Sequence, residues 1–151
     1  MITRYSLLKT ATFLLFTFFV CLNAKAQAGQ TGSLQIVTSK GPVMFAVEYA
    51  ITPKEKAQGL MYKESVPKST GMLFIYQTPK EITMWMKNTP VSLDMIFISN
   101  RGRVRYIEEK TEPNSTRQIH SHGKVSAVLE VVAGTVEDFG IKVGDEVILG
   151  K

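Results

Sequence analysis

The chain has a single cysteine, Cys21, among its 151 residues. Cys21 lies in an apolar run near the N-terminus, and no cysteine follows it. A disulfide framework, a zinc–thiolate site and a cysteine nucleophile are therefore excluded for the chain beyond this run. That part of the chain must be stabilised by its own hydrophobic core.

Long hydrophobic stretches are also lacking. The apolar run 11–22 is shorter than the about 20 residues that a membrane-spanning helix needs. It follows Arg4 and Lys9 and precedes an A-x-A word, Ala24-Lys25-Ala26, which is the pattern of a cleavable signal peptide. We expect residues 1–26 to be this peptide, and the mature protein to be exported, periplasmic or secreted, without stable membrane insertion. An uncleaved signal anchor is the alternative.

A strong net charge is lacking once the signal peptide is removed. The chain has 18 Lys and Arg against 13 Asp and Glu, and three of the basic residues precede position 27, which leaves a net charge of +2. One local basic cluster remains, at Arg101, Arg103 and Arg105. Because aromatic residues are not interleaved with it, we expect no nucleic-acid partner and interpret the cluster as a solvated strand face.

The remaining sequence predicts short strands and two short helices. Residues 27–33 are small and polar, as in a flexible linker, and 34–151 then form one domain. Thr52, Pro53 and Glu55 predict a capped helix that ends near Leu60, and Thr135 is the expected cap of a second helix ending near 139. The predicted strands are 34–38, 43–50, 72–76, 82–87, 93–99, 104–109, 126–132 and 146–149. This pattern favours a small, mainly β, single-domain antiparallel β-barrel or sandwich.

One segment between the predicted strands has no periodicity. Residues 110–123 include Pro113, Asn114 and Gly123 and are expected to form a long loop. Long loops in small domains are often functional. The loop is therefore a candidate border of a binding site.

Several ordered words in this chain resemble one known family. They are Gly59-Leu60-Met61, Gly71-Met72-Leu73-Phe74, Trp85-Met86-Lys87-Asn88-Thr89, Leu93-Asp94-Met95-Ile96-Phe97, Val128-Leu129-Glu130, Ala133-Gly134 and Gly144-Asp145. Together they resemble the uncharacterised domain-of-unknown-function family 192, also called uncharacterised protein family 0127. Lys63 stands where that family usually has an arginine. The resemblance implies a small, commonly exported β domain and implies no reaction.

The methionines around the only tryptophan suggest one kind of site. Met84 and Met86 would share a strand face, with Trp85 on the other. Two thioethers, joined by His120 and His122, could bind copper(I) in an exported protein without cysteine. The alternative is that the methionines fill a hydrophobic core, which is their usual role.

Three acids inside apolar strands suggest a second kind of site. Glu48, Asp94 and Glu130 would each need a partner or a cavity, because an unpaired buried carboxylate is costly. Two of them paired at about 5 to 9.5 Å would suit glycoside hydrolysis. The structural alternative is that they accept hydrogen bonds from loop amides.

Taken together, these residues predict an exported binding or accessory module rather than an enzyme. Its ligand would be a small polar molecule, a glycan or a peptide of the cell envelope, and no cofactor is expected. The expected ligand-binding residues are Trp85, Lys87, Asn88, Asp94, Glu48 and Glu130. The alternatives are a copper protein that uses Met84, Met86, His120 and His122, and a hydrolase that uses paired carboxylates on envelope glycans.

Overall fold

The structure, a computed structural model, describes residues 29–150. The predicted signal peptide lies outside the described residues. Within them the strands are β1 (Thr31–Thr38), β2 (Gly41–Ala50), β3 (Thr70–Lys80), β4 (Thr83–Met84), β5 (Leu93–Ile98), β6 (Val104–Glu108), β7 (Ile119–His120), β8 (Val125–Val132) and β9 (Glu146–Leu149). The helices are α1 (Pro53–Gln58) and α2 (Thr135–Phe139).

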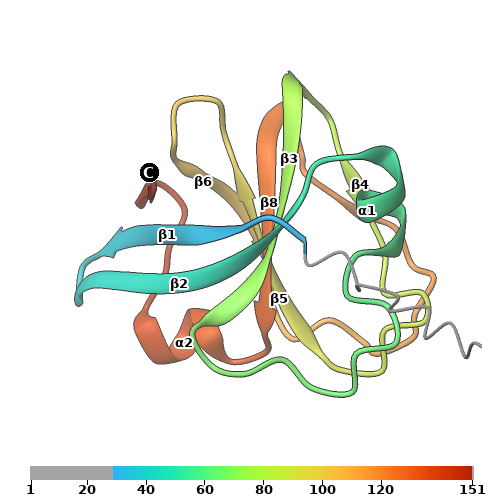
Figure 1. The fold of residues 1–151 in the computed structure, drawn as a ribbon. Coiled ribbons are helices and arrows are strands. Elements are labelled where there is room, and N and C mark those ends of the chain that lie inside the picture. The colour runs from blue at the N-terminus through green and yellow to red at the C-terminus, as the bar shows by residue number, and fades with distance from the viewer. Residues whose placement is uncertain (1–28, 151) are drawn as a thin grey trace, which may run out of the picture.

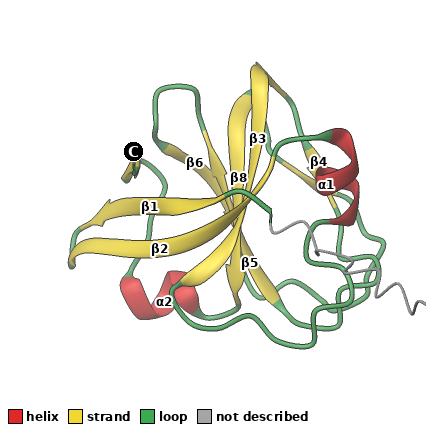
Figure 2. Ribbon diagram, in the orientation of Figure 1, coloured by secondary structure: helices red, strands yellow, loops and turns green. Residues whose placement is uncertain are grey.

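The mainly β architecture that the sequence predicts is confirmed. Seven strands form one sheet in the order β6-β5-β8-β3-β2-β1-β9, and β4 pairs separately with β7. The sheet is strongly curled, so that β1 and β2 cross β3 and β8 at a steep angle (Figures 1 and 2). Its two end strands meet through an isolated bridge between Arg103 and Glu146.

One pairing differs from the antiparallel expectation. β2 and β3 are parallel, with Ala46 opposite Thr70 and Ala50 opposite Phe74. A parallel pair needs a long crossover, and here α1 and the loop after it provide one. The predicted capping box at the start of α1 is confirmed, because Thr52 Oγ1 accepts from Glu55 N and the Glu55 carboxylate accepts from Thr52 N.

The alternation of side chains divides the core in two. One cluster fills the inside of the curled sheet and reaches α2 through Val136. The other lies on the opposite face of β3, β5 and β8, beneath the α1–β3 connection and the β4–β7 pair, and includes Leu60, Phe74 and Met86. Neighbouring residues of one strand therefore contribute to different clusters.

Three local predictions need correction. β1 begins at Thr31, so residues 31–33 belong to the sheet rather than to a linker. The predicted strand 82–87 is regular only at Thr83–Met84, and its partner β7 lies inside the predicted 110–123 loop. Gly134, not Thr135, caps α2, because the Thr135 hydroxyl donates to the Val132 carbonyl instead.

Across residues 29–150, no helix is long and apolar enough to cross a membrane.

Candidate functional site

Glu130 is a buried acid in the middle of the sheet. Its strand β8 places it opposite Met72 of β3 and Met95 of β5, so all three side chains lie on the face of the second core cluster. Glu130 is 4% exposed, and burial raises its pKa to about 8. Among residues 29–150 its carboxyl group makes no hydrogen bond within the protein and no ion pair.

The Glu130 side chain borders a cavity of about 100 Å³, here called the Glu130 cavity. The predicted ligand-binding residues Trp85 and Lys87 also line it, so the structure brings three of the six predicted residues together. The other lining residues are Lys56, Ala57, Gln58, Gly59, Leu60, Met61, Phe74, Tyr76, Thr83, Met84 and Thr89.

Met84 and Trp85 form part of the wall of this cavity. Trp85 is half exposed, and the Lys87 ammonium lies 5.5 Å from its ring centroid. Met84 is partly buried and lines the cavity, with its sulfur 4.0 Å from the Tyr76 hydroxyl. Met86 is 1% exposed and belongs to the core. The two methionines therefore occupy different environments.

Tyr76 and Lys56 were not expected from the sequence. Burial, reinforced by the nearby Glu130, raises the pKa of Tyr76 to about 12, so its hydroxyl remains protonated. The Lys56 ammonium lies 4.5 Å from the Tyr76 ring centroid. Burial, and then repulsion from Lys80, lower the pKa of Lys56. The signal for Tyr76 was its alternation with Met72 and Phe74, which predicts the same sheet face.

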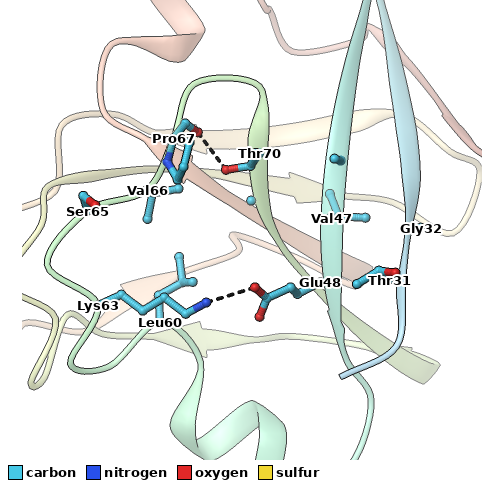
Figure 3. Close-up of a pocket in the computed structure, with 12 residues that line it drawn as sticks. Thr31, Gly32, Val47, Glu48, Leu60, Lys63, Ser65, Val66, Pro67 and Thr70 are labelled. Carbon is cyan, nitrogen blue, oxygen red and sulfur yellow. Dashed lines mark hydrogen bonds and ion pairs between the residues drawn. The ribbon is translucent and has the colours of Figure 1, made fainter. Parts of the chain in front are cut away.

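Glu48 lies in a different cavity. It is exposed on β2 and pairs with Lys63, whose Nζ is 3.0 Å from Glu48 Oε1 (Figure 3). This cavity of about 360 Å³, here called the Lys63 cavity, is lined by apolar Leu60 and Val66 as well. Glu48 is thus an exposed acid that has an ion-pair partner and borders a cavity.

Leu60 separates the two cavities. It is the residue that lines both, and it is itself buried. Glu48 and Glu130 are each opposite Met72, on strands β2 and β8 either side of β3, so their backbones are two strand spacings, about 10 Å, apart. The carboxylates therefore share a sheet face but line different cavities, and no two acids line the Glu130 cavity.

Asp94 has a structural role. It is fully buried, and its carboxylate accepts hydrogen bonds from the backbone amides of Lys110 (2.8 Å) and Val136 (2.9 Å). The register pairs Asp94 with Val131, so its side chain lies on the opposite sheet face from Glu130. The structural alternative, in which the acid accepts hydrogen bonds from backbone amides, is therefore the one observed for Asp94.

Asn88 lies beside the site rather than in it. Its side-chain amide donates to the Tyr62 hydroxyl at 2.9 Å, and its carbonyl accepts from Tyr62 N at 2.8 Å. Its φ of +54° is in the left-handed region, which asparagine tolerates better than most residues. Asn88 therefore holds the turn after Trp85 against the α1–β3 connection.

The two histidines and Met86 occupy different environments. His120 is exposed, with Nδ1 3.1 Å from Thr83 Oγ1, and the exposed His122 ring packs edge-on against Tyr106 at 4.5 Å. Met86 is enclosed in the core. Within residues 29–150 no group of three or more His, Cys, Asp and Glu side chains is arranged to hold a metal.

The words that carry the family resemblance converge on the Glu130 cavity. Its lining draws Gly59, Leu60 and Met61 from one word, Phe74 from the second, Trp85, Lys87 and Thr89 from the third, and Glu130 from a fourth. Those segments are distant in the sequence. The fold therefore gathers the resembling residues around one small cavity.

Comparison with known proteins agrees with this resemblance. Residues 35–149 match the profile of domain-of-unknown-function family 192, described as an uncharacterised ACR. No curated protein matches this chain.

Two crystal structures have the same fold. A putative transcription regulator from Sinorhizobium meliloti 1021 is 36% identical, with a TM-score of 0.78 over 81% of this chain and 95% of that one. A protein of unknown function from Novosphingobium aromaticivorans DSM 12444 is 32% identical, with a TM-score of 0.79 over 82% of this chain and 89% of that one. Family profile, sequence identity and fold agree: the chain belongs to domain-of-unknown-function family 192.

Proposed function

We propose that this chain is an exported binding or accessory module whose Glu130 cavity holds a small polar ligand, or the polar end of an envelope glycan or peptide. The observation that supports the proposal is Glu130, a residue 4% exposed whose side chain borders the cavity and whose carboxyl group has no protein partner among the described residues. Within residues 29–150 no side-chain polar atom is both fully buried and without a hydrogen-bond partner, so the Glu130 oxygens keep contact with the cavity, where a polar group gains from a hydrogen bond. A ligand group entering the cavity would provide that bond.

The protonation state of Glu130 determines what it would recognise. With a pKa of about 8 it is mostly protonated at neutral pH, so it can donate one hydrogen bond and accept others. Amide and hydroxyl groups of glycans and peptides match both roles. The ammonium groups of Lys56 and Lys87 at the cavity would favour a ligand that also carries a negative charge.

The size of the cavity limits what it can enclose. Its volume of about 100 Å³ is about three times the liquid share of one water molecule. One acetamido, carboxylate or hydroxymethyl group would therefore enter, and the rest of the ligand would remain outside. The half-exposed Trp85 indole offers a surface on which a sugar or peptide group would stack.

Fluorescence of Trp85, the only tryptophan, tests the proposal directly. The probes are the disaccharide of N-acetylglucosamine and N-acetylmuramic acid and, separately, the dipeptide D-alanyl-D-alanine. We expect a saturable change with one of them, weakened about tenfold or more in Glu130→Leu. Glu48→Gln, in the Lys63 cavity, is the matched control and should bind like the wild type. A flat titration with both probes, or equal binding by Glu130→Leu, would contradict the proposal.

Export is a separate part of the proposal. It rests on the sequence pattern of residues 1–26. N-terminal sequencing of the protein recovered from the periplasm or medium should give Gln27 as the first residue. Recovery of the uncleaved chain from the cytoplasm alone would exclude export.

A further inference from the structure

A basic groove is lined by residues of the turn between β5 and β6. This turn lies on the side of the molecule away from α1 (Figure 1). The volume of the groove is about 680 Å³. The lining residues are Ser99, Asn100, Arg101, Arg103, Val104, Arg105, Lys124, Val143 and Gly144. Four of them are cationic and none is acidic, so the groove concentrates positive charge that the small net charge of the domain does not suggest.

Two of the guanidinium groups are held in place by backbone atoms. Arg105 Nη2 donates to the His122 carbonyl at 3.1 Å, and Arg103 Nη1 donates to the Gly144 carbonyl at 3.3 Å. Gly123, with φ +136°, leaves room for the Arg105 guanidinium, because a Cβ there would collide with it. Both guanidinium groups are thus positioned by backbone carbonyls that are distant in the sequence.

The charges in the groove are poorly compensated by the protein. Arg103 has one ionic partner, Glu146, at 3.8 Å, and both side chains are about half exposed. Such pairs contribute little. Arg101 and Lys124 make no hydrogen bond or ion pair from their side chains within residues 29–150. Repulsion among these cations would be relieved by an anion that binds between them.

We propose that the basic groove is a binding site for a phosphate group. A phosphate presents several oxygens to the planar forks of two arginines, and its charge matches a site with more than one cation. The groove does not share residues with the Glu130 cavity, so this site is independent of the proposed function. The phosphate belongs either to a soluble molecule or to a lipid headgroup.

Calorimetric titration of the purified protein at low ionic strength tests the site. The soluble probes are inorganic phosphate and pyrophosphate, and the lipid probe is vesicles of equal parts phosphatidylcholine and phosphatidylglycerol. Binding of pyrophosphate identifies a soluble ligand, whereas binding of the vesicles alone identifies a lipid headgroup. Either result should weaken with added salt.

The variant Arg101→Gln/Lys124→Gln removes two charges without removing a side-chain bond of the described structure. It should weaken binding about tenfold or more. The control Lys54→Gln/Lys68→Gln changes the net charge equally at residues outside the groove and should bind like the wild type. Unfolding midpoints of both variants establish that they fold. Absence of binding to every probe, or equal weakening by both variants, would overturn the proposal.

Discussion

The carboxylate of Asp94 accepts a hydrogen bond from the backbone amide of Val136, 42 positions further along the chain, at 2.9 Å. Its other oxygen accepts from Lys110 N at 2.8 Å. One buried side chain on β5 therefore joins the start of α2 to the segment after β6. This contact explains an acid in an otherwise apolar strand without assigning it to a ligand site.

Replacing Asp94 with Asn should destabilise the fold strongly. The amide nitrogen would face a backbone N–H, so one buried donor would lose its acceptor, and a charge-assisted bond would become a neutral one. We expect a loss of about 3 kcal/mol in the free energy of unfolding, measured by urea denaturation. A loss below about 0.5 kcal/mol, the usual range for surface substitutions, would contradict this role.

The raised pKa of Glu130 predicts a pH-dependent stability. The folded state holds the proton up to about pH 8, whereas the unfolded chain releases it near the ordinary value of 4.5. The stabilisation is therefore fully present below pH 4.5 and is lost as the pH rises toward 8. We expect Glu130→Gln to gain about 2 to 4 kcal/mol relative to the wild type between pH 5 and pH 8.

Urea unfolding of both proteins at several pH values measures this difference. Other titrating groups contribute equally to the two proteins, so subtracting the curves isolates Glu130. Parallel curves across this pH range would show that the carboxyl group is not buried as described.

The two methionines beside Trp85 should respond differently to truncation. Met86 is 1% exposed in the second core cluster, so Met86→Ala should leave a cavity and cost about 2 to 4 kcal/mol. Met84 is only partly buried at the Glu130 cavity, so Met84→Ala should cost about 1 kcal/mol. Thermal unfolding compares the two variants under one condition. Equal losses would mean that the two side chains do not differ in burial as described.

Gly71 is needed for the contact between β3 and β8. A Cβ at this position would collide with the carbonyl oxygen of Glu130, so Gly71→Ala should separate the strands next to the Glu130 cavity. We expect a loss of about 3 kcal/mol or more. Gly29→Ala is a suitable control, because a Cβ there meets nothing within 4 Å. Circular dichroism and thermal unfolding of both variants would measure the difference.

Local sequence patterns predicted most of the strands and helices, but not which of them pair or pack together. The predicted strand 43–50, for example, lies within β2. The cap residue Thr52 likewise located α1. These features depend on neighbours in the sequence. The parallel pairing of β2 with β3 does not, since it depends on where the α1–β3 connection crosses the sheet.

The candidate site was predicted in part for the same reason. Trp85 and Lys87 were found as unusual residues in one short segment, and Glu130 as an acid in an apolar strand. Asp94 does not join them because the register puts it opposite Val131 on the other sheet face. Glu48 shares the face of Glu130 but lines the other cavity. The contribution of Leu60, which divides the two cavities, becomes visible only when the α1–β3 connection is placed.

The backbone contact between the ends of β6 and β9 also bears on whether a second chain can add to the sheet. Val104 N donates to Asp145 O at 2.9 Å, and Val147 N donates to Gly102 O at 2.8 Å, so the two end strands use backbone groups on each other. Exposed end strands are templates on which another chain can add, which leads to aggregation. A domain that joins its own strand ends in this way has less unpaired backbone to offer a second copy. The short stretch around Gly102 would thus disfavour the addition of another chain at these strand ends.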